Sequence, residues 1–184
     1  SSSGGGGGGK SQDEIIMDMS KDILGKIPAN FDMEYAQKRY PVMYSECLNT
    51  VVCQELQRFN KLLSKVRSSL QELQKAVKGL VVMSADLDAV MMAMFDNKLP
   101  AAWAKVSYPS LKPLASYVID LLERLEFFQS WVDNGPANIF IMPYFFFVQA
   151  FMTGALQNYA RKYTIPIDTV DFDFEYFKEV PTVP

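Results

Sequence analysis

A long apolar repeat in the middle of the chain constrains its fold more than any other feature. Apolar residues recur there in alternating steps of four and three: Val52, Leu56, Phe59, Leu63, Val66, Leu70, Leu73, Val77 and Leu80. This spacing keeps the apolar residues on one side of an α-helix. The sequence therefore predicts one long helix over about residues 44–78.

The positions beside this repeat favour one of two possible arrangements. A free-standing coiled coil carries complementary charges beside its apolar seam. Here the flanking positions, which include Glu55, Asn60 and Ser69, carry no complementary charge pattern, and Leu62 and Ala76 widen the apolar stripe. Because a wide stripe suits burial against several helices, we favour a mostly α-helical bundle over a coiled-coil dimer.

Shorter helical patterns lie on both sides of the long helix. Ser11 and Glu14 form a capping box that predicts a helix ending at Gly25 and Pro28, and Ser84 is the predicted N-cap of another. The remaining predicted helices cover about residues 31–39, 114–132 and 144–162. Glycine and proline residues separate them, as expected for helix ends.

Beyond residue 165 the apolar residues recur at roughly every second position. Ile165, Ile167, Phe172, Phe174 and Tyr176 alternate with proline and acidic residues. Such alternation is typical of a β-strand with one buried face. Because a lone strand is only marginally stable, we expect a small sheet that is completed by residues outside this chain.

The chain therefore divides into three predicted regions. Residues 1–10, mostly serine and glycine, are expected to be a flexible linker. Residues 11–164 form the helical part, and residues 165–184 begin a truncated β unit.

Composition excludes several kinds of chemistry. The chain has no histidine, which excludes histidine-assisted nucleophiles and histidine-bearing zinc sites. Cys47 and Cys53 lie six residues apart on one predicted helix, about 9 Å along its axis, too far for a disulfide. The most apolar window, residues 139–151, is shorter than the roughly 20 residues that a bilayer span needs. We expect no catalytic, cofactor-binding or metal-binding residue, and no nucleic acid or membrane partner.

One apparent nucleotide-binding motif is judged to be spurious. Gly4–Ser11 matches the phosphate-loop pattern G-x-x-x-x-G-K-[ST], and a predicted helix follows it. A phosphate loop also needs a buried strand before its first glycine, and only three serines precede Gly4.

Two further clusters invite a functional interpretation. The first is a group of cations on the long helix: Arg58, Lys61, Lys65, Arg67, Lys75 and Lys78. We interpret it as a solvated face, or as one paired with an acidic surface of the same assembly, rather than as a phosphate-binding site. The second is aromatic and comprises Tyr144–Phe147, Phe151 and Tyr159. Without interleaved basic residues it is expected to be core rather than a base-stacking platform.

Several uncommon short sequence motifs follow one another over nearly the whole chain. They are Tyr40-Pro41, Arg58-Phe-Asn-Lys-Leu-Leu63, Lys78-Gly-Leu-Val-Val-Met-Ser84, Leu99-Pro-x-x-Trp103, Tyr108-Pro-Ser-Leu-Lys-Pro113, Phe127 to Trp131, Phe145-Phe-Phe, Gln149-Ala-Phe and Asn158-Tyr-Ala-Arg161. In this order and spacing the chain resembles the C-terminal region of dynein heavy chains, most closely the axonemal, inner-arm-like branch. Two departures, Met142-Pro143-Tyr144 and Val148-Gln149, stand where that family commonly has small residues and a proline.

The resemblance implies a largely helical segment that ends in a small β-barrel-like unit and packs on the AAA+ ring of the same heavy chain. It implies an ATP-driven, minus-end-directed microtubule motor of cilia and flagella, located in the cytoplasm, the cytoskeleton and the axoneme. ATP, magnesium, microtubule, and intermediate and light chains would engage other parts of that motor, so this segment is expected to be non-catalytic. The alternative from the residues themselves is a helical scaffold or adaptor that binds partners through the Val52–Leu80 seam.

Overall fold

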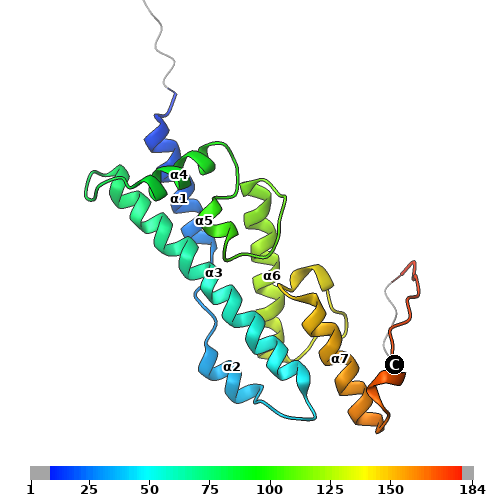
Figure 1. Ribbon diagram of the computed structural model, residues 1–184. Helices are drawn as coiled ribbons and strands as arrows, with labels where there is room; N and C mark the ends of the chain where they lie inside the picture. The colour runs from blue at the N-terminus through cyan, green and yellow to red at the C-terminus, as the bar shows by residue number, and fades with distance from the viewer. Residues whose placement is uncertain (1–8, 180–184) are drawn as a thin grey trace, which may run out of the picture. The chain divides into compact units, whose positions relative to one another are not determined.

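The computed structural model describes residues 9–179, and within them the fold is helical (Figure 1). These residues form seven α-helices and two short 3₁₀ helices. In order along the sequence they are α1 (Gln12–Lys26), α2 (Met33–Arg39), α3 (Cys47–Val77), α4 (Ala85–Phe95), α5 (Ala101–Ala104), α6 (Leu114–Asn134), η1 (Met142–Tyr144), α7 (Val148–Tyr163) and η2 (Ile167–Thr169). The prediction of a mostly α-helical chain is confirmed.

The described residues fall into two compact units. Unit 1 contains the residues up to Asn30 together with Lys61–Leu122, and unit 2 contains Phe31–Asn60 together with the residues from Glu123 on. The first half of α3 therefore belongs to unit 2 and its second half to unit 1. The helix α6 is divided in the opposite order, with its residues up to Leu122 in unit 1 and those from Glu123 on in unit 2.

Local sequence signals set most of the helix ends. The Ser11 hydroxyl accepts from the backbone N–H of Glu14, and the Glu14 side chain accepts from Ser11 N, which confirms the capping box. Ser84 caps α4 through Leu87 N at 3.2 Å, also as predicted. Gly79 and Gly135, with φ of 74° and 99°, follow α3 and α6 in a left-handed conformation that favours glycine.

The long helix is shorter at both ends than its apolar repeat predicts. It begins at Cys47 rather than at residue 44 and ends at Val77. The repeat is buried from Val52 to Leu73, but Leu80 lies in the turn after the helix and is 72% exposed. The seam is therefore core of this chain over most of its length, as expected for a bundle, and its last member is not.

The beginning of α7 also differs from the prediction. Residues 142–144 form η1, and α7 begins only at Val148, after an extended Phe145 and the N-cap Phe147. A helix tolerates proline in its first turn but not in its interior. Pro143 therefore lies in a separate 3₁₀ turn before α7.

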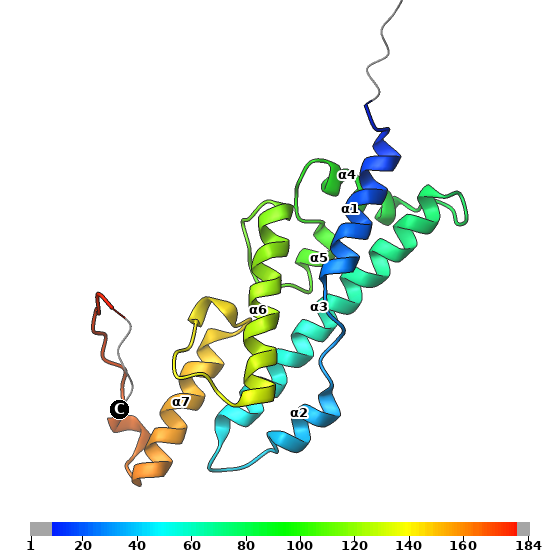
Figure 2. The same ribbon diagram turned by 180° about the vertical axis from the view of Figure 1, so that it is seen from behind.

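In unit 1, aliphatic side chains dominate the core. Leu62, Leu63, Val66, Leu70 and Leu73 of α3 are buried, and α1 packs against α4. The buried indole of Trp103 donates from Nε1 to Ser69 Oγ at 2.7 Å. Trp103 thereby fixes α5 on α3 (Figure 2).

In unit 2, aromatic rings dominate the core. Phe128 of α6 lies 5.2 Å from Phe59 of α3 and 5.2 Å from Phe145, measured between ring centroids. Phe145 in turn lies 4.6 Å from Phe151 of α7. The rings thus connect α3, α6, α7 and the segment before α7.

The C-terminal segment of the described residues contains no β-strand. After η2 the backbone continues to residue 179 without a regular element, and Phe174 and Tyr176 are exposed. The predicted strand requires partner strands, and the described residues supply none.

Candidate functional site

The described residues offer contact surfaces rather than a reaction centre. Among residues 9–179, no group of three or more histidine, cysteine, aspartate or glutamate residues is placed to hold a metal ion. Within the same range, no helix is long and apolar enough to cross a membrane.

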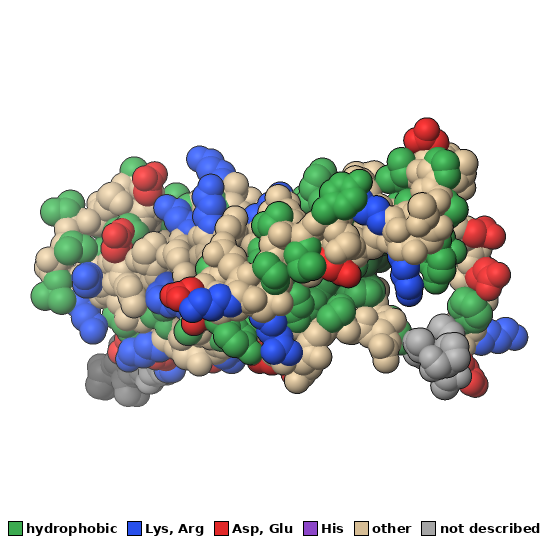
Figure 3. Space-filling view, turned by 90° about the horizontal axis from the view of Figure 1, so that it is seen from below, with side chains coloured by type: hydrophobic (Ala, Val, Ile, Leu, Met, Phe, Trp, Pro, Cys, Tyr) green, Lys and Arg blue, Asp and Glu red, His purple; other side chains and the backbone are tan. Residues whose placement is uncertain are grey.

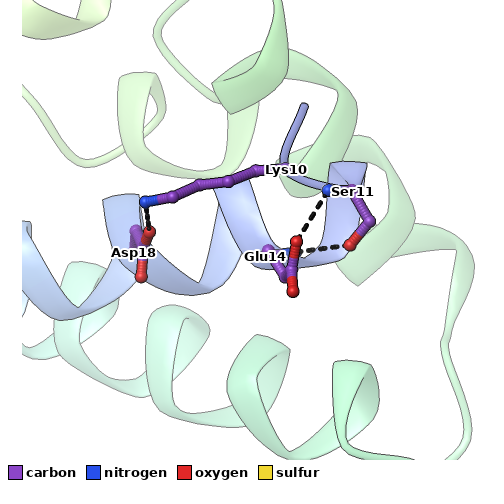
Figure 4. A network of polar contacts seen from close by, with 4 residues as sticks. All are labelled: Lys10, Ser11, Glu14 and Asp18. Carbon is purple, nitrogen blue, oxygen red and sulfur yellow. Dashed lines mark hydrogen bonds and ion pairs between the residues drawn. The ribbon is translucent and has the colours of Figure 1, made fainter. Parts of the chain in front are cut away.

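The glycine-rich motif lies partly outside the described residues, which exclude Gly4–Gly8. Its last two residues, Lys10 and Ser11, make contacts with α1 (Figure 4). Lys10 Nζ lies 2.5 Å from Asp18 Oδ2, and this pairing raises the pKa of Lys10 and lowers that of Asp18. Ser11 is occupied by the capping box. That the motif binds no nucleotide stays a prediction.

A tight crossing of α7 and α3 builds the candidate site in unit 2. We call it the α3–α7 junction, formed by Tyr44, Cys47, Gly154, Asn158 and Arg161. Asn158 Oδ1 accepts from the backbone N–H of Cys47 at 2.7 Å, and so caps the free end of α3 from another helix. A Cβ atom on Gly154 would lie only 3.2 Å from the Val51 side chain, so glycine permits this close approach.

Arg161 fixes the loop that precedes α3. Its guanidinium lies 3.7 Å from the centre of the Tyr44 ring and also donates to the Tyr44 carbonyl oxygen and to Cys47 Sγ. A cation over an aromatic face is electrostatically attracted by the ring. The loop and the last turns of α7 therefore form one surface.

A buried carboxylate fixes the other side of the same surface. Glu55 of α3 is 0% exposed, and its two oxygens accept from Phe146 N at 2.7 Å and Phe147 N at 3.1 Å. Arg58 Nη1 donates to Glu55 Oε1 at 3.0 Å. Burial raises the pKa of Glu55, and the two N–H donors and Arg58 act in the opposite direction. The carboxylate thus holds the segment before α7 against α3.

The aromatic cluster divides between core and surface. Phe145 and Phe151 are buried, as predicted. The prediction of core is wrong for Phe147, which is 51% exposed, and for Tyr159, which is exposed on α7. Glu55 fixes the backbone at residues 146–147, where the Phe146 ring packs 4.7 Å from the Phe59 ring and the Phe147 ring is left exposed.

Aromatic and aliphatic side chains are exposed around the junction. We call this set the α7 surface: Tyr44, Phe147, Tyr159, Tyr163, Ile165 and Ile167. A groove of about 610 Å³ lies between Tyr44, Arg161 and Ile165–Ile167, and another of about 430 Å³ lies between Phe147, Val51 and Gly154. Exposed aromatic residues beside an arginine are typical of protein–protein contacts.

The two cysteines lie on α3, and both are free. Cys47 contacts Arg161, whereas Cys53 lies near the Tyr40 carbonyl oxygen at 3.7 Å. Burial raises the pKa of the Cys53 thiol. Cys53 is therefore a poor nucleophile, because the thiolate is the reactive form.

The predicted cation group on α3 separates into two kinds of residue. Arg58 is paired with Glu55, and Arg67 donates to the Pro28 carbonyl oxygen at 2.7 Å and to Asn30 Oδ1 at 2.9 Å. The lysines at 61, 65, 75 and 78 are exposed. Both arginines thus have structural roles, whereas the lysines face solvent in this chain.

The sequence did not single out Glu55, Asn158 or Arg161 as functional. The one available signal was a charged residue, Glu55, directly before the apolar seam residue Leu56. No spacing along the sequence could indicate their partners, because Glu55 and Phe146 are separated by 91 positions and Cys47 and Asn158 by 111.

Comparison with known proteins gives a consistent match. A family model that describes the C-terminal domain of dynein heavy chains matches residues 1–183. The human dynein axonemal heavy chain 12 (Homo sapiens) is 52% identical over 165 residues, 90% of this chain and 5% of that protein. The mouse dynein axonemal heavy chain 3 (Mus musculus) is 54% identical over 166 residues, 90% of this chain and 4% of that protein. The human dynein axonemal heavy chain 1 is 46% identical over 173 residues, 94% of this chain and 4% of that protein. The chain thus spans about one-twentieth of the length of these relatives.

Proposed function

This chain belongs to the family of C-terminal domains of dynein heavy chains, and on that premise we propose that it is the non-catalytic C-terminal segment of an axonemal dynein heavy chain. In this role it packs on the AAA+ ring of an ATP-driven, minus-end-directed microtubule motor. The motor acts in the axoneme, where it drives the beating of cilia and flagella. The match of residues 1–183 to the family, with axonemal relatives about 50% identical, carries this proposal.

The motor chemistry lies in other parts of the heavy chain. The relatives are roughly twenty times longer than this chain, which leaves room for nucleotide sites, a microtubule-binding region and contacts with intermediate and light chains. ATP and magnesium are accordingly assigned to the whole heavy chain and not to residues 1–184. The contribution of this segment is mechanical, through its contacts.

We assign the ring contact of unit 2 to the α7 surface. Tyr44, Phe147 and Tyr159 expose large aromatic area. Arg161 holds the backbone of Tyr44, and Glu55 holds that of Phe147. Side chains that are already ordered lose less conformational entropy on binding. On the face that Figure 3 shows, apolar side chains reach the surface between cationic and acidic ones.

We also propose that residues 165–176 pair with strands supplied from outside this chain. Phe172 and Phe174 alternate with Asp171 and Asp173, and all four side chains are exposed in the isolated chain. Strand pairing would cover the aromatic face and satisfy the backbone groups. In a longer protein that supplies those strands, Val170–Tyr176 should gain hydrogen-exchange protection and light scattering should fall. Equal protection in both proteins would exclude the pairing.

The alternative of a scaffold that binds through the Val52–Leu80 seam is not favoured. Val52, Leu56, Phe59 and Leu63 are completely buried, and burial continues through Leu73. A seam that forms the core cannot also receive a partner without unfolding.

Photo-cross-linking in the full-length heavy chain tests the ring contact. A photoreactive amino acid placed at Tyr159 or Tyr163, both exposed on α7, should cross-link to AAA+ modules of the same heavy chain. The matched control is the exposed Gln37 on α2. Cross-links from Gln37 alone would reject the α7 surface, and an absence of ring cross-links from all three positions would reject the proposed packing.

A further inference from the structure

The second half of α3, which belongs to unit 1, carries a group of exposed lysines. Lys61, Lys65 and Lys75 lie within about 80° of one another around the helix axis and span about 21 Å along it, from the geometry of an α-helix. Lys78 follows directly after the helix and is also exposed. We call these four residues the lysine face. Leu63, Val66 and Leu70 on the other side of α3 are buried, so the face is directed outward.

Among the described residues, the lysine face differs from several other lysines in having no acidic partner. Lys10 is paired with Asp18, Lys26 with Asp22, Lys38 with Glu34, Lys98 with Asp96 and Lys112 with Asp120. Within residues 9–179, no ion pair involves a lysine of the face. Lys61 and Lys65, four residues apart on α3, repel each other unless a partner neutralises them.

The charge pattern of the face indicates the class of partner. Glu72, an exposed carboxylate, stands between Lys65 and Lys75 on the same side of α3. A uniform polyanion such as nucleic acid or a phospholipid surface would repel Glu72. A folded protein surface can instead place carboxylates opposite the lysines and a neutral or basic group opposite Glu72.

An apolar turn adjoins the face. Leu80 and Val82, in the turn after α3, are 72% and 89% exposed, immediately beyond Lys78. Charged groups next to an exposed apolar cluster form the rim-and-core arrangement of protein interfaces.

We infer that the lysine face docks on an acidic protein surface in another part of the same heavy chain. The inference rests on the proposed function, and about 95% of the length of the axonemal relatives lies outside the matched segment and can supply that surface. The lysines select and orient the surface by charge, and the turn at Leu80–Val82 adds apolar contact.

Zero-length carbodiimide cross-linking of the full-length heavy chain tests this inference, because it joins a lysine only to a carboxylate in direct contact. Links from Lys61, Lys65 or Lys75 to aspartate or glutamate outside residues 1–184 are expected. They should weaken several-fold between about 0.05 and 0.5 M salt, since salt screens exposed charges.

Matched variants identify the residues responsible. K61E/K65E should remove the links made at Lys75 as well, since it reverses the charge of the surface that docks. The control, K21E/K105E, makes the same change in net charge at two exposed lysines of unit 1 that are not on α3, one on α1 and one directly after α5, and should leave those links unchanged. Unchanged circular dichroism of both variants would confirm that each remains folded.

Three results would overturn the inference. They are an absence of links from the face, equal loss of links in both variants, and protection of the face from acetylation only by anionic vesicles or nucleic acid. Ring cross-links from Tyr159 or Tyr163 without links from the face would reject the inference and leave the proposed function intact.

Discussion

The two halves of α3 lie in one continuous helix but use their side chains differently. In residues 47–60, polar side chains beside the seam bind the backbone of distant segments: Glu55 binds Phe146 and Phe147, and Asn60 exchanges two hydrogen bonds with Phe31. In residues 61–77, aliphatic side chains fill the core and lysines face outward. The comparison shows that a uniform apolar repeat can serve two kinds of packing: one depends on how completely side chains fill the core, and the other depends on particular hydrogen bonds.

The largest expected effect is in the aliphatic half. Leu63→Ala or Leu70→Ala should lower the free energy of unfolding by about 2–5 kcal/mol, because each removes a completely buried side chain and leaves a cavity. Urea unfolding of the 184-residue chain measures the change. Lys65→Ala, on the exposed side of the same helix, is the control and should change stability by less than about 0.5 kcal/mol. Losses under that value at both leucines would show that the seam is not core.

A slightly smaller effect is expected from the polar half. Glu55→Ala should cost about 2–4 kcal/mol, because it leaves the N–H groups of Phe146 and Phe147 without an acceptor. Increased hydrogen exchange at Phe146 and Phe147 should accompany the loss. If stability falls while exchange at these two amides stays slow, the carboxylate does not hold this segment.

Glu55 should also make the free energy of unfolding depend on pH, an effect that the aliphatic side chains of α3 cannot produce. Burial raises the pKa of Glu55 above its ordinary 4.5, so the folded state binds this proton more tightly than the unfolded state. Its contribution to stability is therefore greatest below pH 4.5 and decreases as pH rises through the raised pKa. The difference in unfolding free energy between wild type and Glu55→Gln, measured by urea unfolding over a pH series, should show this decrease. A difference that grows with pH would mean that the hydrogen bonds to the carboxylate outweigh its burial.

The smallest expected effect is a difference in stability between two Gly→Ala variants, one in α1 and one in α7. Gly25→Ala in α1 should stabilise the protein by about 0.5–1 kcal/mol, because alanine favours the helix and a Cβ there meets no atom within 4 Å. Gly154→Ala in α7 should lack this gain and be about 1 kcal/mol less stable than Gly25→Ala, since its Cβ would lie 3.2 Å from Val51. Thermal or urea unfolding of both variants compares them directly. Equal stabilisation would show that the α3–α7 junction accommodates a Cβ atom at position 154 without strain.

Local signals in the sequence determined much of the helical framework. The capping box at Ser11, the N-cap at Ser84 and the apolar stripe of α3 act between residues three or four positions apart, so their spacing in the sequence already contains the geometry. For the same reason, α6 agrees with the helix that the sequence predicts over about residues 114–132.

Tertiary structure decided other features, including two helix starts and the exposure of an aromatic side chain. The N–H of Cys47 is satisfied by Asn158, and the first turn of α6 is capped by Asn97, which accepts from Leu114 N and Ala115 N. Phe147 is exposed although it belongs to an aromatic run, because Glu55 fixes its backbone. Each of these contacts joins residues that are far apart in the sequence. Local spacing cannot predict such contacts, because they form only when the whole chain folds.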